Sequence, residues 1–229
     1  MNEPPPRADE RAHRLDAGRA LSPGAQAPAL RTDATAHGAV KGARQINVVF
    51  LEASSGSVVG GSLTGMLELL RGIDRSRISP SVVLYEHKPC IEALEADGIP
   101  VSVFAKSRLP KQHALQHKPA YSRAKRLGPI ASLLWFARTT ATFLFETLPA
   151  AFRLRRTFAP LRPDVVYVCN GFRGNADAIV AARLLGVPCV VHAKGFDKFS
   201  WVERALSRTV AGCVSMTRAI EGHCRTGGM

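Results

Sequence analysis

The chain has 229 residues, of which 46% are hydrophobic and 21% charged, a composition that excludes a wholly disordered polypeptide. Its five cysteines are too few for a disulfide scaffold, and without a Cys-x-x-Cys pair they do not indicate a zinc ribbon or a thioredoxin-type site. The net charge of +13 is concentrated in residues 105–163, which hold twelve Lys and Arg against one Glu, and such a segment favours an anionic partner.

Residues 1–44 are rich in Ala, Pro, Arg and Gly and show no periodic hydrophobicity. They predict a disordered leader, with order beginning near Ile46. The first residues contain no apolar run of the kind found in a signal peptide. We also find no uninterrupted apolar run of the roughly 18 residues that a membrane-spanning helix requires.

From residue 45 onward, short apolar runs alternate with segments of helical periodicity. The strands are predicted at Ile46–Leu51, Ser81–Tyr85, Ile99–Phe104, Val165–Cys169, Pro188–Ala193 and Val210–Ser215, and the helices at Leu63–Leu70, Cys90–Asp97, Asn175–Leu185, Ser200–Arg208 and Thr217–Cys224. This alternation predicts an α/β fold with a Rossmann-like, doubly wound parallel sheet. Because such sheets bind ligands beyond the carboxyl ends of their strands, the loops there are the candidate sites.

The first of these loops ends in Gly60, Gly61 and Ser62, where a helix begins. Adjacent glycines at a helix start allow a phosphate or sugar to approach the backbone N–H groups. The spacing Gly-x-x-x-Gly-Gly matches neither the dinucleotide fingerprint nor the P-loop. The alternative is that the glycines only allow close packing of the helix on the sheet. Glu86, placed where a ribose-binding acid would lie, keeps a dinucleotide-binding oxidoreductase open.

The loop after the fourth predicted strand offers three candidate contacts for a ligand, Asn170, Phe172 and Arg173. An Asn side chain can orient a hydroxyl-rich ligand, and an Arg can bind an anion or remain solvated surface. Asn175 in the same loop is expected to be the N-cap of the next helix.

The fifth predicted strand ends in His192 and Lys194, which share one strand face because side chains alternate. Lys194 stands immediately before Gly195 and is a candidate ligand contact. His192 is either a second site residue or a histidine at the edge of the core. Histidines and carboxylates show no metal-ligand spacing, so no metal is expected, and no Gly-x-Ser-x-Gly motif indicates a serine hydrolase.

The basic segment surrounds an apolar, aromatic run from Ile130 to Leu148. Basic residues flanking such a run favour binding in the plane of an anionic membrane surface. The alternative is a helix packed on the sheet with solvated basic flanks. No nucleic-acid-binding motif is present, so we expect no nucleic-acid partner.

The stretch INVVFLEASSGSVVGGSLTGMLELLRGID resembles the opening of GT-B glycosyltransferases of the family 4 type, in which a strand leads through a Gly-Gly loop into a helix. The stretches LRPDVVYVCNG, AIVAARLLGVPCVVHAKGF and VSMTRAIEGHCRTGG are similar to later strands of that family's N-terminal domain. The resemblance covers about residues 46–229. It implies that residues 45–229 form a family 4-like N-terminal domain, one lobe of a GT-B fold, with a basic amphipathic insertion at about 105–163.

The resemblance implies transfer of a sugar from a nucleotide sugar to a glycan or lipid-linked acceptor in polysaccharide biosynthesis. It further implies a cytoplasmic enzyme, peripheral to the inner face of the plasma membrane, without a bound cofactor or metal. By the same resemblance Gly60, Gly61 and Ser62 approach the donor diphosphate, and Lys194 and His192 are the catalytic candidates. Many members carry His or Arg where this chain has Lys194, which can stabilise phosphate charge but does not titrate like an imidazole.

The family's second lobe, which carries a Glu-x7-Glu motif and binds the nucleotide sugar, has no counterpart in this sequence. We therefore expect the chain alone to have little transferase activity. It would be a truncated product, an acceptor-binding remnant or one half of an enzyme with a separate donor-domain subunit. A non-catalytic module that binds a membrane or a partner protein remains the main alternative.

Overall fold

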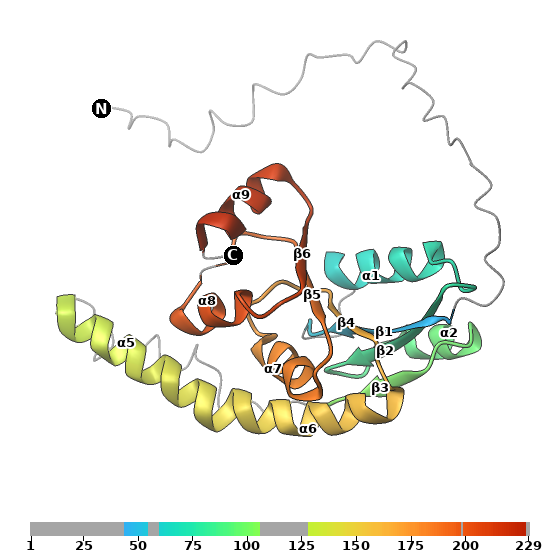
Figure 1. The fold of residues 1–229 in the computed structure, drawn as a ribbon, viewed down its shortest axis with the longest axis horizontal. Coiled ribbons are helices and arrows are strands. Elements are labelled where there is room, and N and C mark those ends of the chain that lie inside the picture. The colour runs from blue at the N-terminus through green and yellow to red at the C-terminus, as the bar shows by residue number, and fades with distance from the viewer. Residues whose placement is uncertain (1–43, 55–59, 106–127, 198, 228–229) are drawn as a thin grey trace, which may run out of the picture. The chain divides into compact units, whose positions relative to one another are not determined.

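A computed structural model describes residues 44–54, 60–105, 128–197 and 199–227 (Figure 1). The predicted leader lies outside the described residues except for Arg44, and so do residues 106–127 of the basic segment.

Six parallel strands form one sheet in the order β3-β2-β1-β4-β5-β6. The strands are β1 (Ile46–Glu52), β2 (Ile78–Leu84), β3 (Val101–Val103), β4 (Val165–Val168), β5 (Cys189–Ala193) and β6 (Gly212–Ser215). This confirms the predicted doubly wound parallel sheet, although β2 begins earlier and β3 and β6 are shorter than the sequence indicates. The chain reverses its direction of travel across the sheet between β1 and β4, which makes the carboxyl ends of these two strands the topological switch point.

Helices follow the strands and connect them across both faces of the sheet. They are α1 (Gly61–Gly72), α2 (Ile91–Ala96), α5 (Gly128–Thr142), the π-helix η2 (Phe143–Thr147), α6 (Leu148–Phe158), the 3-10 turn η3 (Ala159–Leu161), α7 (Ala176–Leu185), α8 (Trp201–Ser207) and α9 (Arg218–Gly227). Figure 1 places α1 on one side of the sheet and α6 and α7 on the other.

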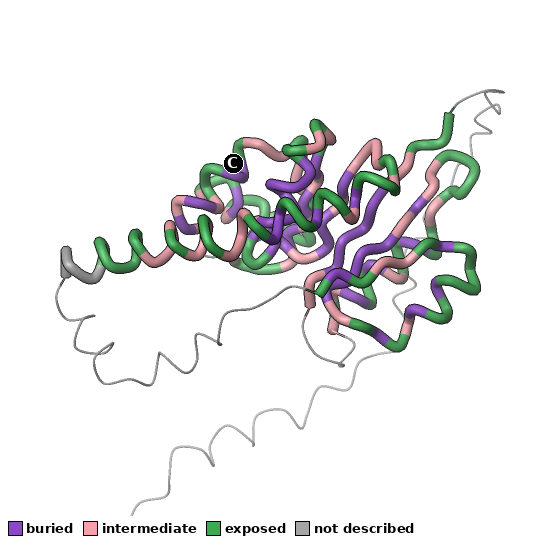
Figure 2. The backbone as a smooth tube through the Cα atoms, turned by 90° about the horizontal axis from the view of Figure 1, so that it is seen from below, coloured by how far each residue is buried: buried purple, intermediate pink, exposed green. Residues whose placement is uncertain are grey.

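Alternate residues of each strand enter two separate cores. In β1, Val48 and Phe50 pack with α1 and α2, whereas Val49 and Leu51 pack with the α6 and α7 side. Both faces of the central strands are therefore buried, as the purple tube through the sheet shows (Figure 2). This two-sided burial explains why the strands read as continuous apolar runs.

Part of the basic segment covers the sheet. Helix α6 buries Ala150, Ala151, Leu154 and Phe158, and it lies against α7. Upstream, the Phe136 ring contacts the Trp201 ring of α8 at a centroid distance of 5.6 Å. Within the described residues, no helix has the length and apolar character needed to cross a membrane.

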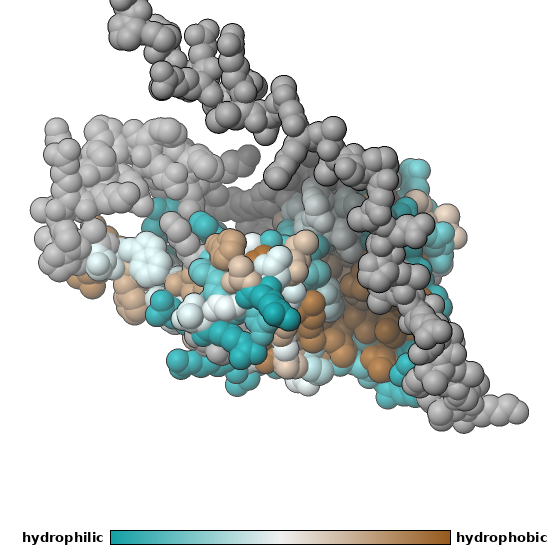
Figure 3. All heavy atoms as spheres, turned by 90° about the horizontal axis from the view of Figure 1, so that it is seen from above, coloured by the Kyte–Doolittle hydropathy of each residue, from teal (hydrophilic) through white to brown (hydrophobic). Residues whose placement is uncertain are grey.

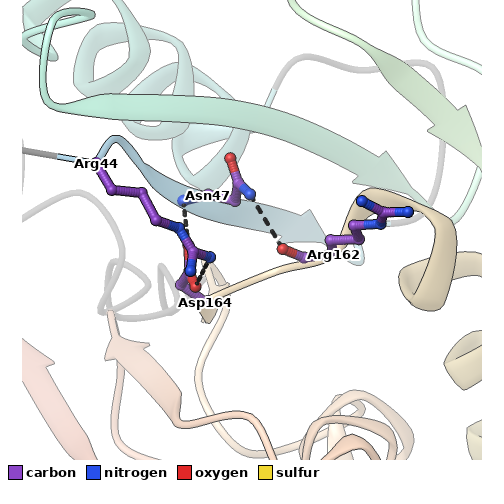
Figure 4. A network of polar contacts seen from close by, with 4 residues as sticks. All are labelled: Arg44, Asn47, Arg162 and Asp164. Atoms are coloured by element: carbon purple, nitrogen blue, oxygen red, sulfur yellow. Dashed lines mark hydrogen bonds and ion pairs between the residues drawn. The ribbon is translucent and has the colours of Figure 1, made fainter.

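At the amino ends of β1 and β4, four residues form a polar clamp (Figure 4). Asp164 binds the Arg44 guanidinium at 2.7 Å and accepts the Asn47 backbone N–H at 2.9 Å, while Asn47 Nδ2 donates to the Arg162 carbonyl. The clamp fixes the register of the two central strands at the edge opposite the candidate site.

Candidate functional site

The candidate site lies at the carboxyl edge of the sheet, and its polar centre is Glu52, the last residue of β1. Glu52 is fully buried, and its Oε1 accepts three hydrogen bonds: from Ser54 N (2.9 Å), Ser62 Oγ (2.9 Å) and Asn170 Nδ2 (3.2 Å). These bonds join the start of α1 to the loop after β4, directly at the switch point. The sequence analysis did not single out Glu52. An acidic residue at the carboxyl end of an apolar strand, at the edge where ligands bind, is a sequence feature that could have indicated a site residue.

Helix α1 begins at this edge. Its N-cap is Gly60 in an extended conformation. Among the described residues, no side chain caps its N–H groups, and no acidic residue lies in its first turn. The first N–H groups of a helix carry a partial positive charge and bind anions when left open. This end of α1 therefore offers an anion-binding position.

Neither packing nor backbone strain accounts for Gly60 and Gly61. A Cβ added at either position would meet no described atom within 4 Å, and neither residue has a positive φ. The alternative that these glycines serve close helix–sheet packing is therefore wrong for the described part of the chain. No atom of the described residues fills the space that they leave.

Lys194 lies at the same helix end. Its Nζ donates a hydrogen bond to the Ser62 carbonyl oxygen at 3.1 Å, and a Cβ at Gly65 would lie 3.0 Å from the same Nζ. Within the described residues, no carboxylate forms an ion pair with the Lys194 ammonium. The predicted residues Gly60, Gly61, Ser62 and Lys194 are thus brought together from two distant parts of the sequence.

His192 lies two residues earlier on β5, half-buried against β4. Its Nδ1 is 3.0 Å from the Tyr167 hydroxyl. Burial, and secondarily the Lys194 charge, lower the pKa of His192 below its ordinary value, whereas burial raises the pKa of Tyr167 to about 12. A protonated phenol can donate to Nδ1, which leaves a neutral imidazole with its proton on Nε2.

Asp197 binds the backbone of the loop after β4. Asp197 Oδ2 accepts the backbone N–H groups of Phe172 (3.0 Å) and Arg173 (3.4 Å). Gly171 takes a φ of +72°, and a Cβ there would lie 2.5 Å from the same oxygen, so only glycine fits this turn. The sequence analysis missed Asp197, because nothing local links it to a loop so far away in the sequence.

The three predicted acceptor contacts in this loop have different environments in the structure. The Asn170 side chain belongs to the Glu52 network, and the Arg173 side chain is exposed. The Phe172 side chain is buried in the core and packs against the Phe199 ring at 5.5 Å, so it is not available to a ligand. Asn175 is the N-cap of α7, as predicted, but its Nδ2 donates to the Asn170 and Gly171 carbonyls rather than capping the helix.

Cys169 follows β4 at this edge, and its side chain is buried. Burial raises the pKa of its thiol well above the ordinary value, the Glu52 charge raises it further, and the Lys194 charge opposes them. A thiol held in its protonated form is inert. In the part of the chain that the structure describes, no three His, Cys, Asp or Glu side chains are grouped to hold a metal ion.

Comparison with known proteins gives one family and several structures. The family model for the glycosyl transferase 4-like domain matches residues 60–229. Among curated proteins, no sequence matches the chain.

The solved structures share the fold at low sequence identity. Alr3699/HepE from Anabaena, solved with UDP and glucose, is 16% identical over 80% of this chain and 42% of its own, with a TM-score of 0.51. A glycosyltransferase from Rickettsia africae is 9% identical over 78% of this chain and 38% of its own (TM-score 0.50). MurG from Acinetobacter baumannii is 18% identical over 74% and 41% (TM-score 0.47). The chain thus spans about two fifths of the length of these proteins.

Proposed function

Because the chain belongs to the glycosyl transferase 4-like family, we propose that it forms the acceptor-binding lobe of a glycosyltransferase whose donor is a nucleotide sugar. The observation that carries the proposal is the hydrogen bond from Lys194 Nζ to the Ser62 carbonyl, 3.1 Å long, at the uncapped start of α1. Two sources of positive charge converge there, and the space over Gly60 and Gly61 is open.

This arrangement suits the diphosphate of a nucleotide sugar. When the glycosidic bond of the donor breaks, negative charge develops on the departing nucleoside diphosphate. A fixed ammonium and preoriented backbone N–H groups stabilise such charge without rearranging. In the proposal Lys194, Gly60, Gly61 and Ser62 supply this stabilisation.

His192 has a different role from Lys194. Because its lowered pKa keeps it neutral at neutral pH, it supplies hydrogen bonding rather than charge. Asn170 and Arg173, at the neighbouring loop, are the proposed contacts for a glycan or lipid-linked acceptor. No step of the proposal uses a metal ion or a bound cofactor.

A complete donor site needs a second lobe opposite this edge. The solved neighbours are more than twice as long as the part that this chain matches, and one of them was solved with UDP. In the proposal the second lobe is a further α/β domain, carried by the same polypeptide or by a separate subunit. The chain as given is then expected to bind diphosphates weakly and to turn over little nucleotide sugar.

We also propose that this lobe works at an anionic membrane, such as the inner face of the plasma membrane, in polysaccharide biosynthesis. Helices α5, η2 and α6 expose a set of large apolar side chains, here called the α5–α6 apolar patch. Its members are Leu133, Leu134, Trp135, Leu144, Phe145 and Phe152. Apolar atoms are open to view at the left of Figure 3, the side on which Figure 1 places α5.

Basic groups adjoin the patch on α6. Phe152, Arg155, Arg156 and Ala159 line a hollow of about 390 Å³. Arginines beside exposed aromatic side chains suit the phosphates of anionic lipids next to their acyl chains. The same surface favours the second candidate function, a non-catalytic module that binds membranes, which differs by lacking the diphosphate site.

Calorimetric titration of the chain with inorganic pyrophosphate at low ionic strength tests the main proposal. We expect Lys194→Met to weaken binding about tenfold, which corresponds to the loss of one charge-assisted contact. Arg75→Met is the matched control, because Arg75 is an exposed cation at the opposite edge of the sheet. Equal affinities for the two variants, or no pyrophosphate binding by the wild type, would contradict the proposal.

A further inference from the structure

One oxygen of the buried Glu52 carboxylate is unexplained by the fold. Among the described residues, this side chain accepts three hydrogen bonds, and all three end on Oε1. Oε2 is buried and has no hydrogen-bond partner among the described residues, and the same is true of the neighbouring Ser54 Oγ. Buried polar atoms in native proteins almost always have a partner, so two such atoms on residues only two positions apart call for a ligand group or an ordered water.

The position of Glu52 is fixed by its partners. Its Oε1 accepts hydrogen bonds from the residues that directly follow β1, from the start of α1 and from the loop after β4. Because these donors come from three different segments, the carboxylate cannot rotate without breaking several bonds. Oε2 is therefore a preoriented acceptor rather than a mobile one.

Ser62 connects this acceptor to the anion position. Its hydroxyl donates to Glu52 Oε1 at 2.9 Å, and its carbonyl accepts from Lys194 Nζ at 3.1 Å. One residue thus separates an unpartnered acceptor from a cation that lies at the uncapped end of α1. A ligand that satisfies both must carry an anionic group and, close to it, a hydrogen-bond donor.

We propose that Glu52 Oε2 and Ser54 Oγ form a hydroxyl-binding subsite beside the phosphate position, and that the ligand is a phosphorylated sugar. The phosphate lies against Lys194 and the first N–H groups of α1, and a sugar hydroxyl donates to Glu52 Oε2. A carboxylate accepts a hydrogen bond from a hydroxyl group but repels a second phosphate. The subsite therefore selects a sugar phosphate over a bare phosphate chain. This inference rests on the proposed function, since it assumes the anion position at Lys194.

Binding of two probes to the full chain tests the subsite. Glucose 1-phosphate and inorganic phosphate are titrated into the wild type, Glu52→Gln and Lys194→Met, with the exposed Glu68→Gln on α1 as the matched control. The glutamine amide oxygen can keep the bonds that end on Oε1, whereas its NH2 group puts donors where Oε2 accepts.

We expect the wild type to prefer glucose 1-phosphate about tenfold, the effect of one hydrogen bond to a charged group. Glu52→Gln should remove this preference without weakening inorganic phosphate binding, because it removes a negative charge and no contact with the phosphate. Glu68→Gln should change neither the preference nor phosphate binding. Lys194→Met should weaken both probes.

The possible outcomes distinguish failure of the subsite from failure of the proposed function. If phosphate binds through Lys194 but glucose 1-phosphate binds no better, or if Glu52→Gln weakens both probes equally, the subsite is wrong and the proposed function stands. If neither probe binds the wild type, both fail. Should Glu52→Gln unfold, Ser54→Ala replaces it, because the Ser54 hydroxyl has no hydrogen bond to lose within the described part of the chain. An unchanged preference in that variant overturns the subsite.

Discussion

Lys194 Nζ and the Ser62 carbonyl oxygen are 3.1 Å apart, although 132 positions separate the two residues in the sequence. The hydrogen bond places the end of β5 against the first turn of α1. It therefore brings a side-chain cation to a helix end that already carries a partial positive charge. The following predictions test what this contact and its surroundings do.

Replacing Gly61 by alanine separates a packing role from a ligand role. A Cβ at this position meets no described atom within 4 Å, so the fold should tolerate Gly61→Ala. Because alanine loses less backbone entropy in a helix than glycine, the free energy of unfolding should stay the same or rise by up to about 1 kcal/mol. Pyrophosphate affinity should nevertheless fall, since the methyl group occupies the space over the N–H groups.

Chemical denaturation and pyrophosphate titration of the same protein measure both effects. A Gly61→Ala variant that unfolds more easily would restore the packing explanation. One that binds pyrophosphate as well as the wild type would place the ligand elsewhere.

Gly65→Ala should disturb the site through Lys194. The added Cβ would lie 3.0 Å from Lys194 Nζ, closer than such atoms normally approach, so the lysine side chain must shift. We expect weaker pyrophosphate binding with little change in the unfolding midpoint, because the far end of a flexible side chain moves easily. Gly72→Ala, where the Cβ has open space, is the control on the same helix.

Gly171 and Gly174 make a matched pair for stability. Both have a positive φ, +72° and +82°, which costs a residue with a Cβ about 1–2 kcal/mol. Only at Gly171 would the Cβ also meet Asp197 Oδ2, at 2.5 Å. Gly171→Ala should therefore lower the free energy of unfolding clearly more than Gly174→Ala, as urea denaturation would measure. Equal losses would show that Asp197 does not hold this turn.

The titration of His192 should respond to Lys194. Burial is the main cause that lowers the pKa of His192, and the Lys194 charge is the second. In Lys194→Met the pKa should rise toward the ordinary value of 6.5 but remain below it, because burial persists. An NMR titration of the ring proton on Cε1 measures this shift. No change in the pKa would mean that the two side chains are electrostatically independent.

The same depressed pKa gives a pH dependence of stability. Between the folded pKa and the unfolded value of 6.5, the unfolded chain binds more protons than the folded one. The contribution of His192 to stability is therefore complete above pH 6.5 and is lost as the pH falls through the folded pKa. His192→Asn should flatten this part of the stability profile; an unchanged profile would assign the acid sensitivity to other groups.

Vesicle flotation tests the α5–α6 apolar patch. The chain should float with vesicles that contain phosphatidylglycerol and not with neutral vesicles, because each basic residue at an anionic surface contributes about 1 kcal/mol. Phe145→Ser should weaken binding to anionic vesicles, since this side chain is 76% exposed. Leu184→Ser on α7, which also removes an exposed apolar side chain, is the control. Equal binding to neutral and anionic vesicles would contradict the membrane proposal.

The sequence predicted the sheet and the position of Gly60 and Lys194 at the same edge of it, because both follow from one rule. Once parallel strands are recognised, the residues that follow them must gather at one edge. The direction in which a loop side chain points follows from no such rule. Phe172 was expected to contact the acceptor, but Asp197 holds the backbone of its loop and the ring turns into the core.

Glu52 was missed for a related reason. In the sequence it is a single acid after the four apolar residues Val48–Leu51, which is also how an exposed strand end looks. Its partners, Ser62 and Asn170, become visible only when the strand order places β1 beside β4. Long-range hydrogen bonds of this kind depend on the tertiary fold rather than on local spacing.

Mapping of amide shifts in a ¹⁵N-resolved NMR titration with inorganic pyrophosphate tests the central claim most directly. If the start of α1 and the end of β5 form an anion site, the largest shifts should fall on Gly60, Gly61, Ser62 and Lys194. The polar clamp at Asn47 and Asp164, on the opposite edge, should not move. Shifts concentrated at that clamp or spread evenly over the basic surface would contradict the account.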